Sequence, residues 1–322
     1  MRVPLGRGAH GYPGTVIRRR SPSPPHRASS EAARTAARAS APAYLADSPP
    51  ARRGWPLGFA HRGADTGREN TLAAFTAAWD AGFTYLELDV HTTADGVLVV
   101  FHDDALDRVT TGAGPLSALT WEQLGEVRVV AEGAGVVADG EGESLLRLAD
   151  LLAALPEARF NVDLKDDAAA PALAALLAEH DAWDRVLVAS FADGRRRAFR
   201  RALADLGHGD RASGARRVAT SGGRAAVAAL VLLGPLGLTG WLHRHAFAVD
   251  CVQVPVRHGR IPVVTPGFVR RCHAAGLPVH VWVVDDAAEM ERLLEMGVDG
   301  IMTDRADVLA ELFTRRGIWP QH

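Results

Sequence analysis

Along most of the chain, short runs of apolar residues alternate with longer stretches in which apolar residues recur every three or four positions. The runs have the length of buried strands, and the longer stretches have the period of amphipathic helices. Strands are expected at residues 57–60, 85–90, 159–164, 185–190, 217–221, 250–255, 278–284 and 299–303. Helices are expected at residues 71–81, 145–155, 169–179, 195–206, 224–233, 266–275, 287–296 and 306–314. Eight strands, nearly all separated by helices, predict an α/β fold of the (β/α)8 TIM barrel type, whose chemistry lies at the C-terminal ends of the strands.

A further apolar run, residues 97–101, follows the second strand after only about six residues. A parallel crossover needs a dozen or more residues, so this run is expected to fold back as an antiparallel hairpin. Folding back would place Phe101 opposite Glu87. Alternation along the strand puts Glu87 and Asp89 on one face, so the hairpin would bring His102 beside both carboxylates.

The composition changes at two places along the chain. Residues 112–142 are polar and rich in glycine and acids, which indicates an inserted loop or small lobe. Residues 1–53 are rich in Arg, Ala, Ser and Pro, with Glu31 and Asp47 as the only acids. Such a segment cannot bury enough apolar surface to fold. We therefore expect a disordered extension, or a start codon placed too far upstream, before a barrel domain at residues 54–322; a basic membrane-surface or transit-like segment is the alternative.

Charge, cysteine content and hydropathy narrow the class of protein. The net charge of −2 argues against bulk nucleic-acid binding. Cys251 and Cys272 are too few for a disulfide framework and lack metal-site spacing, which favours a reducing, cytoplasmic location. The uncharged run at residues 225–242 approaches the length of a membrane span, but Gly234 and Pro235 interrupt it. We expect a helix packed on the barrel there and no transmembrane segment; the sequence does not predict an oligomeric state.

Six short motifs follow one another in the first half of the barrel. They are His61-Arg62-Gly63, Glu69-Asn70-Thr71, Glu87-Leu88-Asp89-Val90, Asp95-Gly96, His102-Asp103 and Leu106-Asp107-Arg108-Val109-Thr110-Thr111-Gly112. Each is weak alone, but their order and spacing together resemble the glycerophosphodiester phosphodiesterase family. The resemblance implies a TIM barrel with an insertion after the second strand. It also implies an enzyme that hydrolyses glycerophosphodiesters to sn-glycerol 3-phosphate and an alcohol.

The resemblance assigns a divalent metal cation to Glu69, Glu87 and Asp89. Carboxylate oxygens without Cys or His partners suit Ca²⁺ or Mg²⁺, and the sequence does not separate these two. Plainer interpretations exist for each acid. Glu69 would suit the positive end of a helix dipole, and the other two could form a salt-bridged strand face.

A fourth metal ligand is implied at Asp163. The family has Asn-x-Glu-x-Lys on this strand, and this chain has Asn161-Val162-Asp163-Leu164-Lys165, so the carboxylate reaches about one methylene less far. In the family the lysine faces the phosphate. Lys165 is the only lysine in the chain. Where arginine has replaced lysine everywhere else, a retained ammonium indicates a position that needs a compact charge, with chance survival as the alternative.

His61 and His102 are the expected proton-transfer groups, because imidazole titrates nearest neutral pH. A lone histidine is more often structural, but two that converge on carboxylates at strand ends favour catalysis. Arg62 is expected to bind a phosphate oxygen alongside Lys165. Trp282 is expected to line the glycerol pocket, with a core position as the alternative.

The sequence thus predicts metal-dependent hydrolysis of a small-molecule glycerophosphodiester by two-histidine acid-base catalysis. It identifies neither the alcohol nor which histidine is the acid. Two alternatives remain. One is a lysophospholipase D-like lipid phosphodiesterase on the same barrel, which would have an exposed apolar rim near the site. The other is a non-catalytic binding barrel, suggested only by Asp163.

Overall fold

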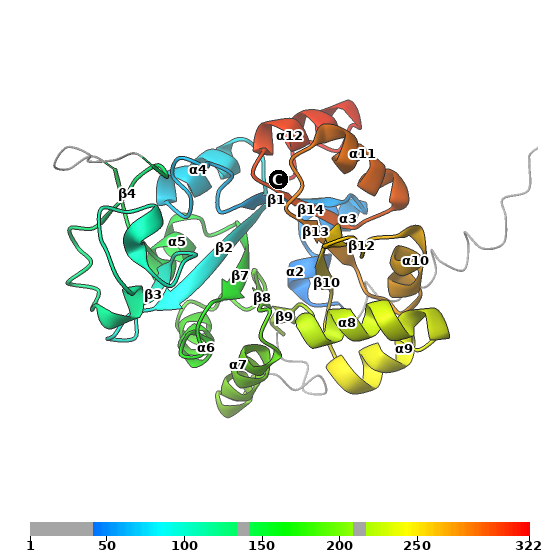
Figure 1. Ribbon diagram of the computed structural model, residues 1–322, viewed down its shortest axis with the longest axis horizontal. Helices are drawn as coiled ribbons and strands as arrows, with labels where there is room; N and C mark the ends of the chain where they lie inside the picture. Colours follow the sequence, from blue (N-terminus) through cyan, green and yellow to red (C-terminus); the bar gives the residue numbers. More distant parts are fainter. Residues whose placement is uncertain (1–40, 134–141, 209–216) are drawn as a thin grey trace, which may run out of the picture.

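Eight parallel strands form the centre of the molecule in the computed structural model, which describes residues 41–133, 142–208 and 217–322 (Figure 1). Around the ring they are β1 (Leu57–His61), β2 (Tyr85–Thr92), β7 (Arg159–Leu164), β8 (Val186–Ala189), β9 (Ala219–Thr220), β10 (Val252–Pro255), β13 (Val279–Trp282) and β14 (Gly300–Thr303). A parallel bridge between Ser221 and Cys251 joins β9 to β10 and closes the ring. The eight expected strands and the TIM barrel are confirmed.

Helices surround the strands and bury their apolar faces against them. They are α4 (Leu72–Asp80), α5 (Leu148–Ala154), α6 (Ala169–Glu179), α7 (Asp193–Asp205), α8 (Arg224–Leu233), α10 (Pro266–Ala274), α11 (Ala287–Met296) and α12 (Ala306–Arg315). Each matches an expected helix to within a turn. Smaller elements follow α8 and β10: η3 (Gly234–Leu236), α9 (Thr239–Trp241), the π-helix η4 (Leu242–Phe247), β11 (Arg257–His258) and β12 (Ile261–Pro262). Among the described residues, no helix is long and apolar enough to cross a membrane.

The start of α4 differs from the expected one. Thr71, expected to be the first residue of the helix, caps it instead, because the Thr71 hydroxyl accepts a hydrogen bond from the Ala74 backbone N–H. Asn70 has a positive φ of 60°, which turns its side chain away from the helix. Asn70 Nδ2 instead lies 3.4 Å from Asp89 Oδ2. The asparagine therefore belongs to the polar end of the barrel.

The hairpin is confirmed, but its register differs from the expected one by two residues. β3 (Leu98–Val100) pairs antiparallel with β2, and the Phe101 N–H donates to the Asp89 carbonyl at 3.0 Å. Phe101 therefore lies opposite Asp89 and not Glu87. The chain turns about one residue later than expected, where Gly96 supplies a φ of 85°. A shift of two residues preserves both faces of a strand, so the following histidine still reaches the acids.

The insertion after the hairpin forms a small lobe beside β2 and β3 (Figure 1). It contains η1 (Leu106–Arg108), η2 (Leu116–Ala118), β4 (Arg128–Val129), β5 (Glu143–Ser144) and β6 (Leu146–Arg147). β4 pairs with β5, and β6 pairs with β3. A separate apolar cluster, which includes Phe101, Leu106 and Leu116, fills the lobe. The lobe is thus anchored to the strand that leads into His102; residues 134–141 of the expected insertion lie outside the described residues.

Two short helices, α2 (Ala43–Ala46) and α3 (Pro49–Arg53), precede β1 and close the N-terminal end of the barrel. The Tyr44 ring is fully buried and meets Tyr85 edge-on, with centroids 5.1 Å apart. The Tyr85 hydroxyl donates to the Tyr44 carbonyl at 2.8 Å and lies 2.7 Å from Ser48 Oγ. These residues form a plug across the end of the ring, where their cluster includes side chains from six barrel strands.

The plug differs from the disorder expected for residues 1–53. The average composition of residues 1–53 does not reveal the plug, because a few well-placed apolar side chains are enough to fill the end of a barrel. We propose that the barrel domain starts near residue 41; residues 1–40 lie outside the described residues.

The C-terminus also reaches this end of the barrel. Gln321 is fully buried, and its side-chain oxygen accepts from the Gly58 N–H at 2.9 Å. Its side-chain nitrogen donates to the Pro56 carbonyl at 2.8 Å. The first strand is therefore held by both ends of the described chain.

The plug generates a prediction about stability. Tyr44→Ala should lower the free energy of unfolding by about 3 kcal/mol or more, because it leaves a ring-sized cavity and removes the contact with Tyr85. The melting temperature should fall on the order of 10 °C. A chain starting at Gly54 should lose at least as much, whereas one starting at Ala41 keeps every contact described above. Equal melting temperatures for the chains starting at 41 and 54 would show that the plug contributes nothing.

Candidate active site

A pocket of about 220 Å³ opens at the C-terminal ends of the barrel strands. Eight of the nine candidate residues line it: His61, Arg62, Glu87, Asp89, His102, Asp163, Lys165 and Trp282. The ninth, Glu69, lies just outside and is bound to Arg62. A larger cavity of about 560 Å³ lies at the opposite end of the barrel. The N-terminal ends of TIM-barrel strands serve stability, so the smaller pocket is the candidate active site.

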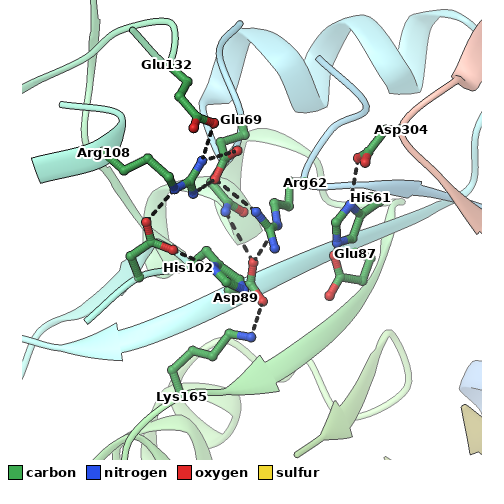
Figure 2. Close-up of polar contacts among 12 residues, drawn as sticks. His61, Arg62, Glu69, Glu87, Asp89, His102, Arg108, Glu132, Lys165 and Asp304 are labelled. Carbon is green, nitrogen blue, oxygen red and sulfur yellow. Dashed lines mark hydrogen bonds and ion pairs between the residues drawn. The ribbon is translucent and has the colours of Figure 1, made fainter. Parts of the chain in front are cut away.

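Asp89 is held between two cations at the centre of the site (Figure 2). Arg62 Nε lies 3.1 Å from Asp89 Oδ2, and Lys165 Nζ lies 2.8 Å from Asp89 Oδ1. Lys165 also lies 2.7 Å from Asp163 Oδ2. Burial tends to raise the pKa of Asp89, but Lys165 and then Arg62 hold it below its ordinary value. The lysine that is unique in the sequence thus bridges two candidate metal ligands.

An unusual backbone turn aims Arg62 into the site. Arg62, Gly63 and Ala64 all have positive φ values, 51°, 85° and 54°. A Cβ on Gly63 would lie 2.7 Å from the Cβ of Ala74, so only glycine fits there. Left-handed residues other than glycine cost roughly 1–2 kcal/mol each and cluster at functional sites. The ion pairs of Arg62 with Asp89 and Glu69 hold this turn in place.

Within the described part of the chain, Glu87 forms no ion pair with an arginine or lysine. It is buried, its Oε2 makes no hydrogen bond, and His61 Nε2 lies 3.7 Å from that oxygen. Burial, and next the neighbouring Asp89, raise the pKa of Glu87 to about 7. Asn70 Oδ1 is a second buried oxygen without a hydrogen-bond partner. Two unsatisfied oxygens beside several carboxylates form a donor set that suits a hard cation.

The four candidate ligands do not converge on one point. Within residues 41–133, 142–208 and 217–322, no group of three His, Cys, Asp or Glu side chains is arranged to hold a metal ion. The reason is that Arg62 and Lys165 stand between the acids. Carboxylates nevertheless outnumber arginine and lysine side chains here, five against three. These are Arg62, Arg108 and Lys165 against Glu69, Glu87, Asp89, Asp103 and Asp163.

His61 is oriented by an aspartate from the last strand. His61 Nδ1 lies 2.6 Å from Asp304 Oδ1, which leaves Nε2 facing Glu87 and the pocket (Figure 2). Burial opposes protonation, but Glu87 and Asp304 raise the pKa of His61 above its ordinary value. The pairing of β1 with β14 places these side chains together. An imidazole held at one nitrogen and open at the other is the arrangement of an acid-base catalyst.

His102 is oriented in the same way by its neighbour. His102 Nδ1 lies 2.5 Å from Asp103 Oδ1, and Arg108 Nε donates to Asp103 Oδ2 at 2.5 Å. Arg108 Nη2 continues to Glu69 Oε1 at 2.6 Å. Partial burial opposes ionisation of Asp103, but Arg108 and His102 hold its pKa at about 2. A chain of charge-assisted hydrogen bonds therefore joins one histidine to a candidate metal ligand.

Asp103, Arg108 and Asp304 were not among the candidates from sequence. Asp103 and Arg108 lie inside the quoted motifs, so the signal was present without a role attached to it. Asp304 follows the last strand, 243 residues after His61, and only the closure of the barrel brings the two together. Trp282 lies in the pocket as expected, with its ring edge-on to Phe191 at 5.5 Å between centroids. The chemical roles of all these residues remain predictions.

Comparison with known proteins identifies a family. The model of the glycerophosphoryl diester phosphodiesterase family matches residues 61–308. The probable glycerophosphodiester phosphodiesterase 2 of Mycobacterium tuberculosis is 38% identical over 83% of this chain and 94% of its own. The crystal structure of glycerophosphodiester phosphodiesterase from Agrobacterium tumefaciens has a TM-score of 0.62 and 25% identity, covering 80% of this chain and 99% of its own. An Oleispira antarctica phosphodiesterase in complex with the product sn-glycerol-3-phosphate has a TM-score of 0.62 and 19% identity, covering 80% and 97%.

Asp166 fixes the end of β2, next to the site. Its carboxylate accepts from the Thr92 N–H at 2.6 Å, the Thr92 hydroxyl at 3.0 Å and the Ala169 N–H at 2.8 Å. Partial burial opposes ionisation, but His91 and these donors hold the pKa of Asp166 at about 2. An ionised Asp166 therefore stabilises the folded state.

This interaction predicts a pH-dependent stability. Asp166→Asn should cost about 1–2 kcal/mol at pH 7, because the folded pKa lies below the unfolded value of about 3.9. The difference should persist down to about pH 4 and fall to about half at pH 3, as the carboxylate of the unfolded wild-type chain takes up its proton while the folded one stays ionised. Urea unfolding at both pH values measures it. Asp167→Asn, at the exposed neighbouring position, is the matched control; a loss equal at pH 3 and pH 7 would contradict the assignment.

Proposed function

Because the chain belongs to the glycerophosphoryl diester phosphodiesterase family, we propose that it hydrolyses a glycerophosphodiester to sn-glycerol 3-phosphate and an alcohol. One observation supports this most directly. Two histidines, His61 and His102, each bound at Nδ1 by an aspartate, border one pocket that also contains acids and two cations. The Oleispira relative was crystallised with the proposed product, sn-glycerol-3-phosphate.

We propose that a divalent cation, Ca²⁺ or Mg²⁺, binds among the oxygens of Glu69, Glu87, Asp89 and Asp163. The unsatisfied oxygens of Glu87 and Asn70 support this assignment. When bound, such a cation supplies positive charge that polarises the phosphate. Asp163, one methylene shorter than the family glutamate, still lines the pocket and binds Lys165, so the substitution has not removed a carboxylate from the site.

The two histidines would divide the proton transfers. With Nδ1 engaged by Asp304 or Asp103, the Nε2 atom of each ring is the one available to substrate. One histidine would remove the proton of the glycerol 2-hydroxyl as it attacks phosphorus, and the other would protonate the leaving alkoxide. Water would then open the cyclic phosphate with the two roles reversed. Direct attack by water on the diester is the alternative route.

Arg62 and Lys165 would bind the phosphate. Both lie in the pocket and are already oriented by buried carboxylates, so little side-chain entropy is left to lose when substrate arrives. Guanidinium and ammonium donors stabilise charge that develops on the phosphoryl oxygens. Trp282 and Phe191 would contact the glycerol carbon atoms from the opposite wall.

A second candidate activity is a lysophospholipase D-like reaction on a lipid. Phe191 is 46% exposed at the pocket mouth, which gives that wall the apolar rim expected for such a substrate. We propose a cytoplasmic location for either activity, since both cysteines are buried and unpaired.

Metal dependence gives the first test of this function. EDTA should abolish turnover of a panel of glycerophosphodiesters, and Ca²⁺ or Mg²⁺ should restore it. Glu87→Gln should weaken metal binding, measured by calorimetry, together with activity. Glu311→Gln, at an exposed position on α12, is the control and should change neither. Full turnover in a metal-stripped sample would contradict the proposed metal dependence.

The histidine pair gives the second test. His61→Ala and His102→Ala should each lower kcat by about 10²- to 10⁴-fold, the range for one acid-base group, with metal affinity unchanged. A p-nitrophenyl ester has a leaving group that hardly needs a proton. On this substrate the variant lacking the general acid should regain most of the wild-type kcat, whereas the variant lacking the general base should not. His258→Ala, at an exposed position, is the control. The assignment is wrong if both variants keep more than about a tenth of wild-type kcat, or if both lose metal.

A further inference from the structure

One outer surface of the barrel exposes apolar side chains in an unusual concentration. The described chain exposes nine large apolar residues, and five of them lie within ten positions of one another. They are Leu232 (72% exposed), Leu233 (39%), Leu236 (72%), Leu238 (39%) and Trp241 (55%), on the end of α8, on η3, at the residue before α9 and on α9. We call this set the α8–α9 surface. Contiguous apolar patches of this kind mark contacts with another body, whereas isolated exposed residues do not.

The local sequence explains why these side chains remain outside. After Arg224, α8 is apolar around its circumference, and of its residues only Ala226 and Leu230 are buried against the barrel. A helix that is apolar on every side ordinarily has partners on every side. After Leu233 the chain turns through η3 and returns in α9, which packs on α10. The outer face of this turn has no covering element among the residues that the structure describes.

The surroundings of this surface are strongly basic. Residues 191–273 contain 14 arginines and 4 aspartates, in a chain whose net charge is −2. From residue 211 to residue 284 the only acid is Asp250, and it is buried.

Exposed arginines flank the apolar residues on both sides. Arg197 and Arg201 lie on α7, Arg244 on η4 and Arg270 on α10. α7 adjoins η4, since Arg196 donates to the Phe247 carbonyl at 3.1 Å. In Figure 1 these helices occupy one continuous side of the molecule, from α7 to α10.

We propose that the α8–α9 surface binds the surface of an anionic lipid bilayer. Apolar side chains with a tryptophan at their edge enter the boundary between headgroups and acyl chains, and surrounding arginines bind lipid phosphates. A two-fold contact with a second copy would instead bring the arginines of α7, η4 and α10 against the same arginines of the other copy, with Asp205 as the one exposed acid on these helices. Residues 1–40, with eight arginines and one acid, carry the wrong charge to cover this surface.

Docking on the α8–α9 surface would also fix the distance between the active site and the membrane. Arg224 begins α8, and its guanidinium carbon lies 5.4 Å from the centroid of the Phe191 ring at the pocket mouth. The ten residues of α8 span about 15 Å. The mouth would therefore lie about one helix length from the lipid headgroups.

Vesicle sedimentation with the full chain tests the proposal. The probes are phosphatidylcholine vesicles with and without phosphatidylglycerol, and wild type should bind only those with phosphatidylglycerol at low salt. Leu236→Ser should weaken binding by about tenfold and Leu232→Ser/Leu236→Ser/Trp241→Ser by more, because each loses apolar area buried in the interface. Leu72→Ser, at an exposed apolar position on α4, is the matched control and should bind as wild type does.

The charges are tested separately. Arg197→Gln/Arg244→Gln should lower affinity on the order of 25-fold, at about fivefold per arginine near an anionic surface. Arg305→Gln/Arg315→Gln, two exposed positions outside residues 191–273, is the control pair and should have no effect.

Other outcomes would overturn the proposal. It fails if wild type binds neither kind of vesicle. It also fails if the serine variants bind vesicles normally but turn a dimer into a monomer in light scattering, because the surface would then join two copies. Turnover of a water-soluble glycerophosphodiester without vesicles should match wild type in every variant. If the wild-type protein shows no turnover at all, the proposed function is wrong, but the result with vesicles still stands.

Discussion

At one end the barrel buries more carboxylates than arginine and lysine side chains. Asp89 is almost completely buried, and it persists as a carboxylate because Lys165 and Arg62 bind its two oxygens. An unpaired charge in that position would cost several kcal/mol. Lys165 also binds Asp163, and Arg62 also binds Glu69. One charge network therefore joins the loop after β1 to β2 and to the end of β7. Glu87 is paired with neither of these cations, and the proposed metal site rests on its unsatisfied oxygen.

Sequence patterns anticipated most of the fold because strand and helix periods are local properties. All eight barrel strands and their helices could be placed in this way. The hairpin register was wrong by two residues, since the turn at Gly96 depends on one φ angle that periodicity does not encode. The plug was missed because the burial of Tyr44 depends on a contact with Tyr85 on β2. Asp304 was missed for the same reason: its partner His61 is distant in sequence.

The molecule separates its charges between two sides. The acids of the site gather on β2 and β7 and on the loops beside the inserted lobe, whereas residues 191–273 carry an excess of arginine. An anion approaching the basic side is attracted before it meets the carboxylates of the pocket. This arrangement lets an acidic pocket, proposed to hold a cation, coexist with a surface that attracts phosphate groups.

The buried Gln321 has a consequence for how the chain folds during synthesis. Its side chain accepts a hydrogen bond from the backbone N–H of Gly58, 263 residues earlier. The second edge of β1 pairs with β14, which is also synthesised late. At 5–20 residues per second, the ribosome needs about 13–50 s to add that length of chain. For that time β1 is an open strand edge beside an unfinished sheet. The barrel can therefore close only after β14 and Gln321 have been synthesised and have left the ribosome.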